Sequence, residues 1–112
     1  MKDLHNKNCI PCKGGVPPFE ISEIHKYIKK VDGWDVKNKE EKTYFLEKNF
    51  SFNNFKESQK FINQVGEIAE KEGHHPDIWF GWGYAKIKIF THAINGLHES
   101  DFVLAAKIDK IS

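Results

Sequence analysis

Residues able to do chemistry are concentrated in one stretch, EKEGHHPDIWFGWGYAKIKIFTH, which runs from Glu70 to His92. This stretch holds three of the six histidines of the chain, His74, His75 and His92. Histidine changes its charge near neutral pH, so it can act as a general acid or base, and its neutral ring also binds metal ions. The histidines of this stretch could therefore transfer protons, bind a metal ion or only pack in the core.

The adjacent pair His74 and His75 precedes Pro76, and this order constrains the geometry of the pair. Proline disfavours helical dihedral angles in the residue before it, so a helix cannot continue through the two histidines. Neighbouring side chains in an extended segment point to opposite sides. We therefore expect one histidine to line a site and the other to bind or brace from another direction. A lone histidine is most often a surface or hydrogen-bonded core residue, but three histidines near a carboxylate weaken that interpretation.

The two cysteines, Cys9 and Cys12, form a C-x-x-C pair. Such a pair can be a redox couple or half of a four-ligand zinc site. The redox interpretation needs a thioredoxin-like context, and the zinc interpretation needs a second ligand pair, for which His5 is the nearby candidate. The breaker-rich sequence KGGVPP follows at once. Residues 1–18 are therefore interpreted as an N-terminal segment with a Gly/Pro linker and two reduced thiols.

The composition is that of an ordinary globular domain. A chain of 112 residues is near the common size of one domain, and we expect residues 19–112 to form it. Charged residues make up 29% of the chain with a net charge of +1, which argues against bulk electrostatic binding of nucleic acid or of a membrane. No apolar run approaches the roughly 20 residues of a membrane span, and the first residues lack a signal-peptide core, so a cytoplasmic protein is expected.

Hydrophobic periodicity predicts the elements that must position these residues. Helical spacing is expected over 17–31, 53–73 and 101–111, with Asn53 or Asn54 as the N-cap of the longest helix and Gly73 as its end. Two-residue alternation predicts hairpins over 34–52 and 77–92.

The last predicted strand runs to His92, with Thr91 on its core face and His92 on the opposite face. The predicted fold class is α+β with two layers. A four-stranded antiparallel sheet carries the helices on one face, in the order αββαββα.

Seven residues of this region also carry a resemblance to a known family. Their order is Glu70, three residues, His74, His75, Pro76, five residues, Trp82, nine residues, His92, eight residues and Asp101. This arrangement resembles the signature of the pterin-4a-carbinolamine dehydratase family. The stretches CIPCKGGVPPFEISEIHKYIKKVDGW, FSFNNFKESQKFINQVGEIAE and THAINGLHESDFVLAAKID resemble the N-terminal part, central helix and closing helix of bacterial members. The resemblance thus covers nearly the whole chain.

The resemblance implies dehydration of a 4a-hydroxytetrahydropterin to the quinonoid dihydropterin, which regenerates the cofactor of aromatic amino acid hydroxylases. Water leaves when the 4a-hydroxyl gains a proton while ring nitrogen N5 loses one, so the site needs an acid and a base. By the resemblance, His74 and His92 are these groups, and Glu70 and Asp101 orient histidines by accepting their other N–H. No metal, nucleotide or redox cofactor is expected, because N5 supplies the electron push.

The resemblance also assigns residues to substrate binding. His75 is expected mainly to bind the pterin, and Pro76 and Trp82 belong to the same site. Aromatic residues on a short strand lie more often in a core or an interface, but Trp82 holds the aromatic position of the signature. His98 stands where family members usually carry a Thr or Ser N-cap, so we expect a weaker start of the last helix.

Other interpretations stay open at this point. Asp101 is near a helix start, where its carboxylate could instead cap free N–H groups. His74, His92 and a carboxylate would suffice for a zinc or iron site, which would make the chain a metal-binding protein. A non-catalytic dimerisation partner is another possibility, since some animal members of the family also bind a transcription factor. A homodimer or homotetramer is expected, and no nucleic acid or membrane partner.

Overall fold

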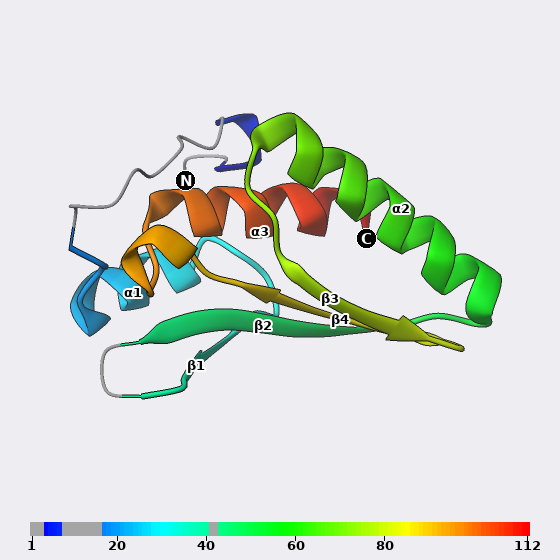
Figure 1. The fold of residues 1–112 in the computed structure, drawn as a ribbon, viewed down its shortest axis with the longest axis horizontal. Coiled ribbons are helices and arrows are strands. Elements are labelled where there is room, and N and C mark those ends of the chain that lie inside the picture. The colour runs from blue at the N-terminus through cyan, green and yellow to red at the C-terminus, as the bar shows by residue number, and fades with distance from the viewer. Residues whose placement is uncertain (1–3, 8–16, 41–42) are drawn as a thin grey trace.

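The protein is described by a computed structural model that covers residues 4–7, 17–40 and 43–112. Figure 1 shows two layers, with the sheet below and the helices α1, α2 and α3 above it. The elements along the chain are the 3-10 helix η1 (Leu4–Asn6), α1 (Ile21–Ile28), β1 (Asp35–Asn38), β2 (Tyr44–Ser51), α2 (Phe55–Glu72), β3 (Asp77–Gly81), β4 (Tyr84–Ile89), the 3-10 helix η2 (His92–Ile94) and α3 (Glu99–Ile111). The α+β class, the antiparallel sheet and the order αββαββα are confirmed.

The sheet has the strand order β1-β2-β4-β3, and all of its pairs are antiparallel. Strand β4 lies in the interior of the sheet, and its alternate residues Ala85, Ile87 and Ile89 are completely buried under the helices. Leu46 of β2 is paired with Ile89 and is buried with it. The two-residue alternation thus fixes which face of each strand meets the helical layer.

Helix α2 has a defined start and end. The side chain of Asn54 caps its first turn by accepting a hydrogen bond of 2.9 Å from the backbone N–H of Glu57. At the other end, Gly73 adopts a left-handed conformation with φ 66°, and the N–H groups of Gly73 and His74 both donate to the carbonyl of Ala69. A residue without a side chain is favoured in this conformation, so Gly73 ends the helix directly before the histidine pair.

Helix α3 lies over the middle of the core. Its residues 101–105 are all buried, and Phe102 and Leu104 are completely inaccessible to solvent. Leu4 of η1 belongs to the same hydrophobic cluster. The carbonyl of His5 accepts a hydrogen bond of 2.9 Å from Lys107, which ties η1 to α3. Part of the segment 1–18 therefore packs against the domain core.

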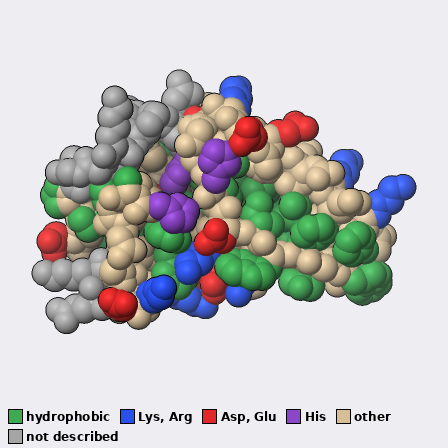
Figure 2. Space-filling view, viewed as in Figure 1, with side chains coloured by type: hydrophobic (Ala, Val, Ile, Leu, Met, Phe, Trp, Pro, Cys, Tyr) green, Lys and Arg blue, Asp and Glu red, His purple; other side chains and the backbone are tan. Residues whose placement is uncertain are grey.

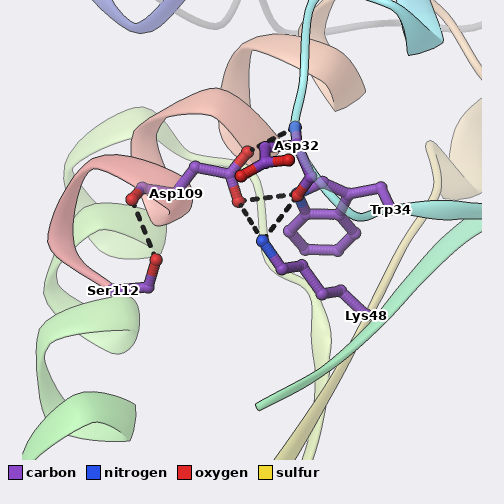
Figure 3. Close-up of polar contacts among 5 residues, drawn as sticks. All are labelled: Asp32, Trp34, Lys48, Asp109 and Ser112. Carbon is purple, nitrogen blue, oxygen red and sulfur yellow. Dashed lines mark hydrogen bonds and ion pairs between the residues drawn. The ribbon is translucent and has the colours of Figure 1, made fainter.

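A polar network joins the end of α3 to β2 and to the loop that follows α1 (Figure 3). One carboxylate oxygen of Asp109 accepts hydrogen bonds of 2.9 Å from Trp34 Nε1 and from Lys48 Nζ. The other oxygen accepts from the backbone N–H of Asp32 at 3.0 Å, and Lys48 also donates to the carbonyl of Asp32. These bonds link α3 to β2 and to the loop after α1, so the network stabilises the scaffold.

Several predicted boundaries differ from the structure. Helix α1 spans Ile21–Ile28, within the predicted range 17–31. Strand β4 ends at Ile89, because Thr91 pairs only with Gly96 in an isolated bridge and the chain then turns through η2. Asn95 completes this turn in the left-handed region, with φ 51°. His92 therefore starts a 3-10 turn and does not extend a strand. Helix α3 begins at Glu99, before the predicted start at residue 101.

Cys9 and Cys12 lie outside the residues that the structure describes. Within the described part of the chain, no helix is both long enough and apolar enough to cross a lipid bilayer.

Candidate active site

The centre of the candidate site is the carboxylate of Asp101, which is completely buried in the first turn of α3. One of its oxygens lies 2.7 Å from Nε2 of His74. The other oxygen accepts hydrogen bonds from the hydroxyl of Thr91 at 2.7 Å and from the backbone N–H of His98 at 2.8 Å. An ionised carboxylate only accepts hydrogen bonds, and three donors around one buried group match that form.

This geometry selects one tautomer of His74. Because Nε2 faces a carboxylate oxygen, Nε2 carries the hydrogen, and the lone pair of the neutral ring is on Nδ1. The side chain of His74 is only 14% exposed, so the ring is held between the end of α2 and the start of α3. His74 is thus a fixed imidazole with one nitrogen left to accept a proton.

Asp101 performs both roles that the sequence left open. It accepts from the backbone N–H of His98, the residue before α3, and so caps the helix through the side chain at its third position. The same carboxylate holds His74. The ring of His98 lies 4.6 Å from the ring of Phe19, so a histidine at this position packs against an aromatic residue while Asp101 satisfies its N–H.

Thr91 is a member of this site that the sequence analysis did not select. Its side chain belongs to a residue only 7% exposed, and its hydroxyl donates to Asp101. The alternation of β4 placed Thr91 on the core face after Ala85, Ile87 and Ile89, and a polar residue at such a position needs a buried partner. A polar residue on the predicted core face was therefore the sequence feature that could have identified Thr91.

His92 follows Thr91 directly in the chain. The hydrogen bond between Thr91 and Asp101 therefore holds the backbone of His92 near Asp101, the residue that also binds His74. The imidazole of His92 is exposed and lies 4.2 Å from the ring of Phe90. It has no hydrogen-bond partner among the described residues, so both of its nitrogens are available to a ligand. Figure 2 shows histidine side chains gathered where α2 ends and β3 begins.

The second histidine of the pair has a different environment, as the extended geometry predicts. Nε2 of His75 lies 2.5 Å from a carboxylate oxygen of Glu70, and these side chains are 59% and 79% exposed. Glu70 therefore contacts His75 and not His74. Pro76 follows at the start of β3 and is partly buried.

Trp82 is not brought to this site within one chain. It lies in the tight turn between β3 and β4, at the opposite end of the hairpin from His74 and His92, and is 72% exposed. The five residues of β3 separate it from Pro76. The six steps along the chain, at about 3.3 Å per residue, span roughly 20 Å. The predicted site residues thus divide into a cluster around Asp101, an exposed pair and a distant tryptophan.

The arrangement suits proton transfer. Both oxygens of Asp101 accept hydrogen bonds, from His74, Thr91 and the backbone of His98, so the carboxylate orients these groups. In the described part of the chain, no three His, Cys, Asp or Glu side chains are grouped so that they could hold a metal ion. The site holds a part-buried imidazole, that of His74, which Asp101 orients, and an exposed imidazole, that of His92, whose backbone adjoins Thr91.

Comparison with known sequences identifies the family. Residues 17–111 match the family model described as pterin 4 alpha carbinolamine dehydratase. A protein of Rubrobacter xylanophilus, provisionally named a pterin-4-alpha-carbinolamine dehydratase, is 50% identical over 99% of this chain and 100% of its own length. A provisionally named dehydratase of Alkaliphilus metalliredigens is also 50% identical, over 98% of this chain and 96% of its own.

Solved structures show the same fold. A Brucella melitensis protein described as a transcriptional coactivator/pterin dehydratase superposes with a TM-score of 0.76 at 28% identity, over 84% of this chain and 97% of that one. A pterin dehydratase-like protein identified as a RuBisCO assembly factor in the alpha-carboxysome gives a TM-score of 0.60 at 25% identity, over 70% of this chain and 88% of that one. Sequence and structure together show that the chain belongs to the pterin 4 alpha carbinolamine dehydratase family.

Proposed function

We propose that the protein dehydrates a 4a-hydroxytetrahydropterin to the quinonoid dihydropterin by histidine acid/base catalysis. The observation that carries this proposal is the Asp101 carboxylate, which hydrogen-bonds both to His74 and to Thr91, the residue before His92. Asp101 binds His74 directly and reaches His92 through the neighbouring Thr91. One carboxylate thus orients the His74 imidazole and holds the backbone segment that carries His92. In the proposed complex, the flat substrate lies between the two rings.

The reaction can be balanced on these residues. A protonated imidazole donates to the 4a-hydroxyl, the C4a–O bond breaks, and water leaves. A neutral imidazole takes the proton from N5, and the N5 lone pair forms the C4a=N5 double bond. His74 suits the role of base, because its Nδ1 holds the lone pair, and His92 suits the role of acid. The roles reverse if the opposite 4a stereoisomer presents its hydroxyl to His74.

The buried carboxylate contributes to the proton transfer through His74. When His74 accepts a proton, Asp101 stabilises the imidazolium at 2.7 Å without having to move. The hydrogen bonds from Thr91 and His98 hold the carboxylate in place for this task. Asp101 and Thr91 are therefore positioning residues in the proposed mechanism.

His75, Glu70 and Pro76 are proposed to form the binding edge of the site. The exposed ring of His75 is oriented by Glu70 and can donate to polar atoms of the pterin. Pro76 fixes the extended backbone that separates the directions of the two histidines. No metal or redox cofactor takes part in the proposed reaction.

We also propose that the functional unit is a homo-oligomer in the cytoplasm. Strands β1 and β3 are the edges of the sheet, and Trp79 and Trp82 next to the β3 edge are 45% and 72% exposed. Exposed tryptophans beside an open strand edge are typical of a subunit contact. Trp82 could contact a bound pterin only in the site of a neighbouring subunit.

The test is a dehydration assay with freshly generated 4a-hydroxytetrahydropterin, followed by absorbance of the quinonoid product. The proposal predicts a rate well above spontaneous dehydration, and an equal rate after dialysis against a chelator. A rate lost on chelation and restored by zinc or iron would support a metal site. A rate equal to the spontaneous one would favour a non-catalytic binding protein.

A further inference from the structure

A cavity of about 220 Å³ lies in the helical layer, between η1, the end of α2 and the end of α3. Its apolar walls include Ile68 of α2 and Ile111 of α3, and His5 of η1 lines a third side. None of its lining residues belongs to the candidate active site. The cavity is therefore a separate feature of the molecule, to which the proposed reaction assigns no role.

The charges around this cavity do not balance. Among the residues that the structure describes, Lys71, Lys107 and Lys110 line it together with one carboxylate, that of Glu72, so these side chains have a formal charge of +2 at neutral pH. Lys71 and Lys110 have no carboxylate within ion-pair distance in the described part of the chain. Positive charge gathered against apolar walls favours an anion at the same place.

Lys107 is the innermost of the three ammonium groups. Its side chain is 18% exposed, lies 3.6 Å from a carboxylate oxygen of Glu72 and donates to the carbonyl of His5. An ammonium group has three N–H donors, so one donor of Lys107 has no partner among the described residues. The lining thus presents both exposed and part-buried ammonium groups to a ligand.

The size and the walls narrow the class of ligand. An engineered apolar cavity of about 150 Å³ holds benzene, so a cavity of 220 Å³ has room for one ring and a small charged group. A phosphate or sulfate would leave the isoleucine walls uncovered. A neutral hydrocarbon would leave the ammonium groups without a counter-charge.

We propose that this cavity binds a small organic monoanion, namely an aromatic or short aliphatic carboxylate. The ring or chain lies against Ile68 and Ile111, and the carboxylate faces the ammonium groups of Lys71, Lys107 and Lys110. Such a ligand joins η1, α2 and α3, and it stabilises the folded chain by mass action, in proportion to its occupancy. This inference is independent of the proposed catalytic activity.

The experiment is a titration of ¹⁵N-labelled protein with phenylacetate, followed by amide chemical shifts. Saturable shifts are expected at residues 5, 68, 71 and 107–111, and the uncharged analogue 2-phenylethanol should bind more weakly. Each exposed lysine contributes modestly, so Lys71→Gln and Lys110→Gln should each weaken binding roughly two- to fivefold. Lys71→Arg keeps the charge and should bind as the unmodified protein does.

The matched control is Lys56→Gln, which removes an exposed lysine from the opposite end of α2 and should leave binding unchanged. The proposal is overturned if no saturable shifts appear at roughly 10 mM phenylacetate, the range of weak binding. It is also overturned if 2-phenylethanol binds equally well, or if the shifts centre on His74 and His92 instead of the cavity. If Lys56→Gln lost as much affinity as Lys71→Gln, the binding would depend on the overall charge of the protein and not on this cavity.

Discussion

The carboxylate of Asp101 and the imidazole of His74 form a 2.7 Å hydrogen bond between residues 27 positions apart in the chain. The bond joins the first turn of α3 to the segment that leaves α2, and it is shielded from solvent on the Asp101 side. Because Asp101 also binds Thr91, its carboxylate connects the segments that carry both candidate acid/base histidines.

Replacing Asp101 with asparagine should lower kcat by roughly 100- to 10,000-fold, the usual contribution of a general acid or base. The amide NH2 group would face His74 or the Thr91 and His98 donors, so either His74 takes the wrong tautomer or a buried donor loses its acceptor. The free energy of unfolding should also fall by about 1–3 kcal/mol. Steady-state kinetics and urea unfolding measure the two effects.

The control for that variant is Asp109→Asn, which alters a part-buried carboxylate at the other end of α3. Asp109 binds Trp34, Lys48 and the backbone of Asp32 but none of the site residues. The Asp109→Asn variant should have a lower free energy of unfolding and an unchanged kcat. Equal loss of kcat in both variants would mean that Asp101 acts only through stability.

Alanine at His74 or at His92 should chiefly lower kcat, again by roughly 100- to 10,000-fold, because each removes a proton-transfer group. Alanine at His75 should chiefly raise KM. The double variant of His74 and His92 should be non-additive if both act on one stereoisomer, and nearly additive if each acts on a different one.

His25→Ala, on the exposed surface of α1, is the control for the three histidine variants and should behave as the unmodified protein does. If His75→Ala abolished turnover while His74→Ala retained it, the proposed roles would be inverted. Near-normal kinetics in all three would exclude histidine catalysis.

Thr91→Val should lower both stability and kcat, because it keeps the shape of the side chain but removes the donor to Asp101. A buried hydrogen bond of this kind contributes about 0.5–1.5 kcal/mol, or more where a charged group is involved. Thr91→Ser restores the hydroxyl and should restore kcat. A valine variant with normal kcat and a normal pH profile would show that Thr91 has no part in orienting Asp101.

The attachment of η1 should weaken in acid. A hydrogen bond from Lys7 lowers the pKa of Glu99 below its ordinary value of 4.5, and the hydroxyl of Tyr27 acts in the same direction while burial opposes both. A carboxyl with a lowered pKa in the folded state stabilises the fold above its ordinary pKa. That stabilisation is lost as the pH falls through the lowered value.

Glu99→Gln should therefore be less stable than the unmodified protein at pH 7, and the difference should shrink in acid, below the ordinary pKa of 4.5. Urea unfolding at several pH values gives the comparison. Glu67→Gln, at an exposed position of α2, serves as the control. A stability difference that stays constant from neutral to acid pH would contradict the assignment.

Light scattering should give a mass above that of the 13.0 kDa monomer at micromolar concentration. Burial of Trp79 and Trp82 beside the β3 edge supplies part of the contact energy, so replacing both with glutamate should shift the mass towards the monomer. A stable monomer of the unmodified protein would contradict the proposed assembly.

Most of the fold could be predicted from local patterns. The alternation of β4 and the stripe of α2 each match one element and one buried face, and Gly73 with Pro76 identifies the end of α2. These features depend on neighbours within a few residues. The sequence around each element is therefore enough to predict its type and its buried face.

The site could be predicted in part. The three histidines of residues 70–92 stood out by residue type, and the resemblance supplied Glu70 and Asp101. The pairing could not be predicted, and the structure shows that Glu70 binds His75 while Asp101 binds His74. Thr91 was missed for the same reason. Its partner is on another element, and such contacts follow from how elements dock. The position of Trp82 likewise depends on where the hairpin turns.

The placement of Asp101 and Asp109 on the last helix has a consequence for biogenesis. Asp109 closes contacts up to 77 residues away, and Asp101 reaches back to His74, so neither network can form before the last helix is available. Chains are synthesised from the N-terminus, and contacts between distant segments form late because closing long loops is slow. A ribosome-bound chain that still lacks α3 has neither a sealed interior nor an oriented His74. Under the proposed mechanism, His74 is therefore oriented for proton transfer only after the final helix docks.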